Sequence, residues 1–185
     1  MITTAIKEVL EKYIKGKDTD RFELLEKIYG ENSKVTFEIK PNSITFPSSI
    51  HGNKKIAQVL SYDFNKKYSN IKTYYLSNDF PDIENLKIDK QKWLVLMSEK
   101  SSDNIYVGTG YYNWEFEYKQ EGILQIRHQH IFIEAMIKLT KFPLNLLLDL
   151  QKSISYPWAS LNGVQKLVQK YDDLVEITQY LNNKK

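Results

Sequence analysis

Two consecutive stretches decide the fold: "IYVGTGYYNWEFEY", Ile105 to Tyr118, and "GILQIRHQHIFIEAM", Gly122 to Met136. Both alternate apolar with polar side chains, which is typical of half-buried strands. Only the short polar segment around "KQEG" joins them, and strands with so short a link pair as an antiparallel hairpin. Gly108 and Gly110 inside the first strand predict a bulge or sharp bend that curves the sheet.

Further strand patterns precede this hairpin. "IKTYYLS" and "KWLVLMSE" complete an antiparallel meander of four strands. Upstream, "KVTFEIK" alternates cleanly and predicts a half-buried strand, and "SITF" predicts a short strand before Pro47. The chain therefore predicts one curved sheet whose last four strands are neighbours in sequence order.

Helical patterns lie before and between these strands. Residues 4–15 space their apolar side chains at helical intervals, and a second helix, capped by Asp18 or Thr19, ends near Gly30. A third helix, capped by Asn53, has one apolar stripe. A helical hairpin therefore opens the domain.

The chain becomes helical again after Met136. "PLNLLLDLQKSIS" predicts one short helix, and residues 163–181 predict a longer one with a single apolar stripe. That stripe must be buried on the helix's own sheet or on a partner subunit. The last helix is therefore a candidate lid or dimer arm.

Composition narrows the class of protein. At 185 residues the chain fits one domain with an appendage, and its 13 Tyr, 8 Phe and 3 Trp favour sheet faces and lined cavities. The absence of cysteine excludes disulfides and thiolate metal or redox sites. The net charge of +3 is dispersed in short lysine pairs, without the basic stripe of a nucleic-acid surface.

The hydropathy pattern predicts no membrane association. "MITTAIKEVLEKY" interrupts its apolar residues with charges, unlike a signal peptide, and "FPLNLLLDL" is too short to span a bilayer. We expect a cytoplasmic protein with neither a membrane nor a nucleic acid as partner.

The order of elements resembles that of the nuclear transport factor 2-like superfamily, which includes SnoaL-like polyketide cyclases, ketosteroid isomerases and scytalone dehydratases. Three motifs carry the resemblance: "KIYGENSKVTFE" at the end of the helical hairpin, "IHGNKKIAQVL" at the start of the third helix, and "EGIL" before the last strand. The likeness covers residues 4 to about 136. We therefore predict a cone domain over residues 1–136 and a helical C-terminal extension over 137–185.

The resemblance implies an α+β fold, a cone-shaped curved antiparallel sheet wrapped around the N-terminal helices. Such a cone leaves an apolar cavity open at one end, and we expect this protein to dimerise through the sheet. The resemblance implies no metal and no cofactor. Because many relatives serve as ligand binders or dimerising modules, the fold alone does not decide the function.

His128 and His130 raise the main question about a site, because they share a predicted strand face with Leu124, Ile126 and Phe132. Burial disfavours the charged imidazole, so a neutral histidine in a cavity is suited to act as a general base or as a donor to a carbonyl. The alternative is that both are buried and bonded to tyrosines or backbone. A metal site would need a third ligand, and we predict none.

The residues of the related enzymes are only partly present. Ketosteroid isomerases use a first-helix tyrosine, which Tyr13 resembles in spacing, and a first-strand aspartate, whose position falls on Phe37. Tyr74 stands where scytalone dehydratases have their first histidine. Cyclases use a late aspartate, and the late strands here offer only Glu134. Isomerase chemistry is therefore disfavoured.

The aromatic stripe of the first quoted stretch has two interpretations. Tyr112, Trp114, Phe116 and Tyr118 share one strand face, which is typical of a core or a subunit interface, and the alternative is a wall against which a ligand stacks. We predict His128 and His130 as catalytic residues. The residues predicted to bind a ligand are Tyr13, Tyr74, Tyr112, Trp114 and Phe132.

These patterns predict a homodimeric protein that binds a small hydrophobic molecule in an apolar cavity. If it is an enzyme, it is a cofactor-free isomerase, cyclase or dehydratase acting on a hydrophobic carbonyl compound. The competing hypothesis is a non-catalytic interaction module of the same fold, with a cavity filled by its own side chains.

Overall fold

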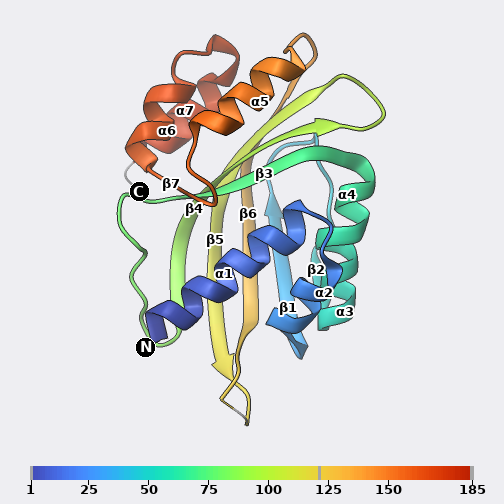
Figure 1. The fold of residues 1–185 in the computed structure, drawn as a ribbon, viewed down its shortest axis with the longest axis vertical. Coiled ribbons are helices and arrows are strands. Elements are labelled where there is room, and N and C mark those ends of the chain that lie inside the picture. Colours follow the sequence, from blue (N-terminus) through green and yellow to red (C-terminus); the bar gives the residue numbers. More distant parts are fainter. Residues whose placement is uncertain (1, 121, 184–185) are drawn as a thin grey trace.

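A curved seven-stranded sheet with strand order β2-β1-β6-β5-β4-β3-β7 organises the fold (Figure 1). The computed structural model describes residues 2–120 and 122–183. The strands are β1 (Tyr29–Ile39), β2 (Ser49–His51), β3 (Tyr68–Leu76), β4 (Lys87–Glu99), β5 (Ile105–Tyr118), β6 (Leu124–Leu139) and β7 (Trp158–Ala159). The helical segments are α1 (Ile2–Asp18), α2 (Phe22–Ile28), α3 (Asn53–Ala57), π-helical η1 (Gln58–Asp63), α4 (Phe64–Lys67), α5 (Leu144–Ser153), α6 (Leu161–Val168), 3₁₀-helical η2 (Asp172–Leu174) and α7 (Val175–Asn182).

The predicted α+β fold and the antiparallel meander β3–β4–β5–β6 are confirmed. The sheet as a whole is mixed, because β1 runs parallel to β6 and β7 runs parallel to β3. The predicted strand "SITF" is wrong. That segment is irregular, and the short strand β2 forms three residues later, at Ser49, where it pairs with β1.

Helices α1 to α4 cover the concave side of the sheet, which we call the inner face (Figure 1). Helix α1 crosses this face with one buried stripe spaced at helical intervals, and the stripe consists of Ile6, Val9, Leu10, Tyr13 and Ile14. Helices α2 and α3 pack beside β1, and α4 packs against η1 and β3. The main hydrophobic core therefore lies inside the cone.

Helices α5, α6 and α7 pack on the opposite side, the outer face (Figure 1). They bury a second core against Leu94 and Leu96 of β4 and Ile105 and Val107 of β5. The last apolar stripe is thus buried on its own sheet, and it does not close the mouth of the cone. The single helix predicted over 163–181 is wrong, because an extended Tyr171 and the turn η2 separate α6 from α7.

Two bulges bend β6 against β5. The first lies opposite Thr109 and Gly110, as the glycine pair predicted. A Cβ on Gly110 would lie 1.9 Å from the Phe132 carbonyl oxygen, so only glycine permits this approach. The second bulge, at Arg127, inserts one residue into β6 and reverses which side chains face inward beyond it.

Two sequence predictions remain, one for the "EGIL" motif and one for membrane-spanning helices. Glu121 of the "EGIL" motif lies outside the described residues. No helix in the described ranges has the length and apolar character needed to cross a bilayer.

Candidate functional site

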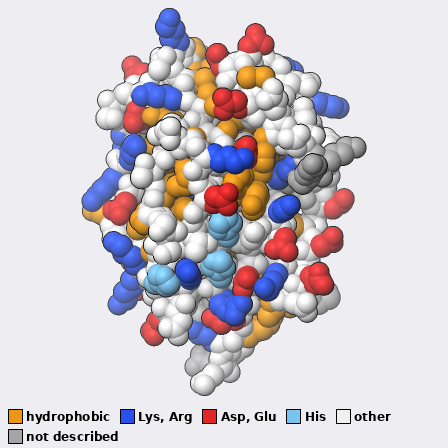
Figure 2. All heavy atoms as spheres, turned by 180° about the vertical axis from the view of Figure 1, so that it is seen from behind, with side chains coloured by type: hydrophobic (Ala, Val, Ile, Leu, Met, Phe, Trp, Pro, Cys, Tyr) orange, Lys and Arg blue, Asp and Glu red, His pale blue; other side chains and the backbone are white. Residues whose placement is uncertain are grey.

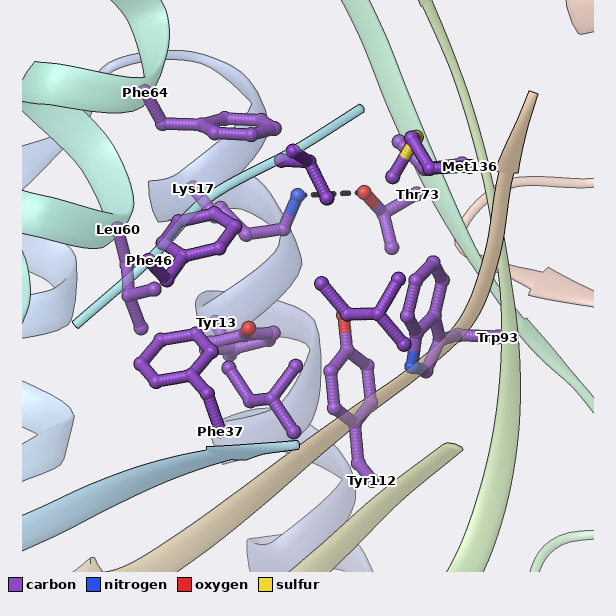
Figure 3. A pocket seen from close by; sticks show the side chains of 14 residues that line it. Tyr13, Lys17, Phe37, Phe46, Leu60, Phe64, Thr73, Trp93, Tyr112 and Met136 are labelled. Atoms are coloured by element: carbon purple, nitrogen blue, oxygen red, sulfur yellow. Dashed lines mark hydrogen bonds between the residues drawn. The ribbon is translucent and has the colours of Figure 1, made fainter. Parts of the chain in front are cut away.

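The interior of the cone contains a small cavity, which we call the cone cavity (Figure 3). Its volume is about 40 Å³. Its lining side chains, which come from α1, the 40–48 segment, η1, α4 and strands β1, β3, β4, β5 and β6, are Tyr13, Lys17, Phe37, Ile44, Phe46, Leu60, Phe64, Thr73, Trp93, Val95, Tyr112, Ile131, Ile133 and Met136. The wall is therefore apolar and aromatic, with a few polar groups.

Lys17 is the charged group of this wall. It follows Tyr13 by four residues on α1, so it continues the buried stripe and turns its ammonium into the cavity (Figure 3). Its Nζ donates to Asp18 Oδ1 at 2.8 Å and to Thr73 Oγ1 at 2.6 Å. Its Nζ also lies over the Phe64 ring, 5.0 Å from the ring centroid. Two of the three ammonium protons of Lys17 therefore have oxygen acceptors, and no residue among 2–120 and 122–183 provides a third.

Asp18 neutralises this charge behind the cavity wall. Its side chain is fully buried, and both oxygens accept hydrogen bonds. Oδ1 accepts from Lys17 and from the Thr73 hydroxyl at 2.9 Å, while Oδ2 accepts from the Thr73 backbone N–H at 2.6 Å and from the Tyr156 hydroxyl at 3.1 Å. A buried ion pair is stable only when such hydrogen bonds satisfy it. Asp18 thus holds Lys17 in place and is itself occupied.

Two further donors in the wall lack acceptors. The Tyr13 hydroxyl and the Trp93 indole N–H are buried and make no hydrogen bond of ordinary distance and angle within the described part of the chain. Burial raises the pKa of the Tyr13 hydroxyl, and hydrogen-bonding interactions with the side chains of Gln129 and Tyr112 partly oppose this rise. Buried polar groups nearly always have partners, and leaving one unpaired costs about 1–3 kcal/mol. These donors therefore point to a partner that the folded chain does not supply.

Aromatic packing fixes the positions of these donors. The Tyr13 ring meets Tyr112 edge-on at a centroid distance of 5.7 Å and Trp114 at 5.0 Å. Trp93 stacks on Tyr112 at 5.5 Å. Among the residues predicted to bind a ligand, Tyr13 and Tyr112 line the cone cavity and Trp114 packs directly against Tyr13.

His128 and His130 do not reach the cavity, and their predicted position inside the cone is wrong. The bulge at Arg127 turns both side chains to the outer face, although Ile126 before it points inward. There the Thr36 hydroxyl lies between them, 3.1 Å from His128 Nε2 and 3.0 Å from His130 Nδ1. Figure 2 shows histidine side chains on this face, surrounded by charged ones.

The histidine pair has carboxylates near it but no metal-binding set. His128 Nδ1 lies 4.0 Å from Glu115, and His130 Nε2 lies 3.8 Å from Glu38. Partial burial lowers the pKa of His128, although the Glu115 charge opposes the shift. Across residues 2–120 and 122–183, no three histidine or carboxylate side chains are grouped to hold a metal ion.

Tyr74 and Phe132 were also predicted in the cavity, and both lie on the outer face instead. Tyr74 belongs to the core under the C-terminal helices, where its hydroxyl donates to the Gln151 carbonyl at 3.3 Å. Phe132 follows His130 on the outward side and stacks on Tyr111 at 4.6 Å. The bulge in β6 displaces Phe132, and the register shift in β3 before Lys72 places Tyr74 outward.

Sequence reasoning missed Lys17, Thr73 and Trp93. Lys17 had a recognisable signal, since a charged residue stands on the apolar stripe of α1 four positions after Tyr13. Thr73 and Trp93 had none, because alternation in a strand gives two faces without saying which one points inward.

Comparison with solved structures identifies the fold. A curved mixed sheet that encloses α1 and carries an apolar cavity is an α+β cone. It is the nuclear transport factor 2-like fold. Hexachlorocyclohexane dehydrochlorinase LinA is similar at 11% identity with a TM-score of 0.61, covering 75% of this chain and 90% of its own.

Two further structures agree. A LinA-type3 dehydrochlorinase from Novosphingobium barchaimii has 13% identity, a TM-score of 0.58 and coverage of 75% of this chain and 90% of its own. A nuclear transport factor 2-like superfamily protein from Salmonella enterica has 12% identity, a TM-score of 0.57 and coverage of 77% and 93%. No protein-family profile and no curated protein matches the sequence. The likeness therefore establishes the fold and leaves the activity open.

Proposed function

We propose that the protein binds a small apolar molecule inside the cone through a carbonyl or carboxylate oxygen of that molecule. The observation that carries the proposal is the pair of buried, unpartnered donors in the cavity wall, the Tyr13 hydroxyl and the Trp93 indole. The free proton of Lys17 adds a third donor. An oxygen acceptor on a ligand would satisfy groups that the chain leaves unpaired.

The chemistry of the wall favours binding over catalysis. Proton transfer needs a base within hydrogen-bond reach of the substrate. The lining side chains of the cone cavity include no carboxylate and no imidazole. Asp18, the nearest carboxylate behind the wall, already accepts four hydrogen bonds. The proposed role is therefore that of a cofactor-free binder of a hydrophobic carbonyl compound.

Native mass spectrometry of freshly purified protein, followed by denaturation to release bound compounds, tests the proposal first. Calorimetric titration with apolar ketones and carboxylates of about six to ten carbons tests it second. Tyr13→Phe should weaken binding about fivefold, the value of one hydrogen bond.

Tyr75→Phe is the matched control for this titration. Its hydroxyl is also buried but donates to the Leu10 carbonyl at 3.0 Å, and its side chain does not line the cavity. The control should leave the affinity unchanged. A protein that carries no compound and binds none of the panel contradicts the proposal.

A dimeric interaction module is the second candidate, and one observation favours it. The cone cavity of about 40 Å³ is far below the roughly 300 Å³ of a typical ligand pocket. The outer face below α7, with Tyr111 on Phe132 and the histidine pair, is the surface left for a second copy. Sedimentation equilibrium measures the association: a dimer that never binds a small molecule would favour the module.

A further inference from the structure

Three phenylalanine rings form a column along one side of the cone cavity (Figure 3). Phe46 is the middle ring. It is nearly parallel to Phe37, with a centroid distance of 4.8 Å and an interplanar angle of 7°, and it stacks on Phe64 at 6.2 Å and 24°. Phe37 and Phe64 belong to β1 and α4, whereas Phe46 belongs to the irregular segment between β1 and β2. The two outer rings are therefore fixed by regular structure and the middle ring is not.

The segment that carries Phe46 is tied to the sheet only near its ends. Lys40 N–H donates to the Ile133 carbonyl at 3.1 Å, the Ser43 hydroxyl donates to the Met136 carbonyl at 2.6 Å, and Ser48 accepts from Phe37 N–H at 3.1 Å. Within the described residues, Thr45, Phe46 and Pro47 form no hydrogen bond. Local opening requires little loss of bonding where few bonds exist. The Phe46 ring can therefore leave the column while the sheet stays intact.

A second cavity of about 140 Å³, which we call the side cavity, adjoins the same ring. It shares Ile44, Phe46 and Phe64 with the cone cavity of about 40 Å³. Phe46 thus forms part of the wall between two spaces that are each too small for an ordinary ligand. Withdrawal of the ring would join them and would free the space between Phe37 and Phe64.

We propose that this space is a binding site for one planar aromatic ring that carries a carboxylate or ketone oxygen, and that Phe46 fills it when the ligand is absent. The inference rests on the proposed function and specifies its ligand class. Parallel and offset ring stacking favours an aromatic occupant over an aliphatic one. The Phe64 ring lies under the Lys17 ammonium, so a ring between Phe37 and Phe64 brings its oxygen substituent next to the free ammonium proton.

Phe46 cannot supply the hydrogen-bond acceptor that such a ligand supplies. Its ring gives the stacking contacts but has no acceptor for Lys17 or Tyr13. An aromatic carboxylate provides both the stacking and the hydrogen bonds, so it replaces Phe46 with a net gain. The site is therefore occupied by an incomplete substitute for its ligand.

Calorimetric titration of the full-length protein with phenylacetate tests the inference through Phe46→Ala. A residue that merely lines a pocket weakens binding when it is truncated, whereas a residue that competes with the ligand strengthens it. If the ring leaves the column in about a tenth of the molecules, its removal tightens binding about tenfold. Phe80→Ala is the matched control, because Phe80 is also half-buried in an irregular segment but packs on Trp158, outside the cavity.

Cyclohexylacetate, which has the same carboxylate on a non-planar ring, tests the ligand class. The Phe46→Ala protein should prefer phenylacetate by about fivefold, the scale of one aromatic pair. Phe46→Leu serves if the alanine variant does not fold, and it should tighten phenylacetate binding by a smaller factor because a branched side chain fits the space less well than a ring.

The outcomes separate the two proposals. Tighter phenylacetate binding by the Phe46 variants supports the inference. Binding that Tyr13→Phe weakens but that the Phe46 variants leave unchanged or weaken overturns the inference and leaves the proposed function standing. Absence of phenylacetate binding in all variants overturns this ligand class, and the wider carbonyl panel then tests the proposed function alone.

Discussion

Replacing Tyr13 by Phe removes one buried hydroxyl and leaves every ring contact in place. The Tyr13 side chain is fully buried, and its edge-on contacts with Tyr112 and Trp114 involve the ring, which Phe retains. Within the described residues, the hydroxyl makes no hydrogen bond of ordinary distance and angle. Its desolvation therefore opposes folding without compensation, by about 1–3 kcal/mol. We expect Tyr13→Phe to raise the free energy of unfolding of the ligand-free protein by about 1 kcal/mol.

Tyr75→Phe should change stability in the opposite direction. Its hydroxyl is equally buried but donates to the Leu10 carbonyl at 3.0 Å, so its loss leaves that carbonyl with one fewer partner. We expect a decrease of about 1 kcal/mol. Because both residues are fully buried tyrosines of the same core, one on α1 and one on β3, the difference between the variants isolates the hydrogen bond.

Urea denaturation followed by circular dichroism measures both changes, and thermal unfolding gives a second measurement. For a chain of this length, 1 kcal/mol corresponds to about 2–4 °C in Tm. A loss of more than about 1 kcal/mol in Tyr13→Phe would refute the reasoning, because it would mean that Gln129, Tyr112 or a buried water bonds the hydroxyl. The case for an external acceptor would then lose its main support.

Three further predictions concern the sheet and its covering. His128→Gln should reduce the loss of stability on acidification. Burial lowers the folded-state pKa of His128, so the stabilising contribution of the neutral imidazole is present above about pH 6.5 and is lost as the pH falls through that lowered pKa. The change in Tm between pH 7 and pH 5 measures this effect. Gly110→Ala should lower the free energy of unfolding by at least about 3 kcal/mol in chemical denaturation, because the new Cβ would lie 1.9 Å from a backbone carbonyl oxygen. Gly163→Ala in α6 should instead stabilise the protein slightly, because the nearest atom would lie 3.5 Å from the new Cβ. Truncation after residue 142 should expose the outer core, so size-exclusion chromatography should detect aggregates, and a monodisperse truncated protein would contradict this.

The fold was predictable from sequence because alternation, helical spacing and glycine position are local properties. The meander between residues 68 and 139 follows from alternating strands with short links, and the bend at Gly110 follows from the close approach that glycine alone permits. The C-terminal helix was predicted as one segment because its apolar spacing continues through Tyr171, where the backbone turns.

The site was only partly predictable, and one residue explains most of the failure. The bulge at Arg127 carries no glycine or proline, yet it reverses the alternation and moves His128, His130 and Phe132 to the outer face. Tyr13 was found because helical spacing does not depend on a partner strand. Lys17 was overlooked on the same stripe, because a lysine at a helix end is usually solvated and only the position of Asp18 and Thr73 explains its burial.

The attachment of α5, α6 and α7 to the same chain changes how the outer core depends on dilution. A surface covered by a separate subunit is exposed whenever the protein concentration falls below the dissociation constant. A tethered cover has an effective local concentration on the order of millimolar, whatever the amount of protein present. Leu94, Leu96 and Val107 are buried by α5–α7 of their own chain. They therefore remain covered at protein concentrations at which a contact between two subunits would dissociate.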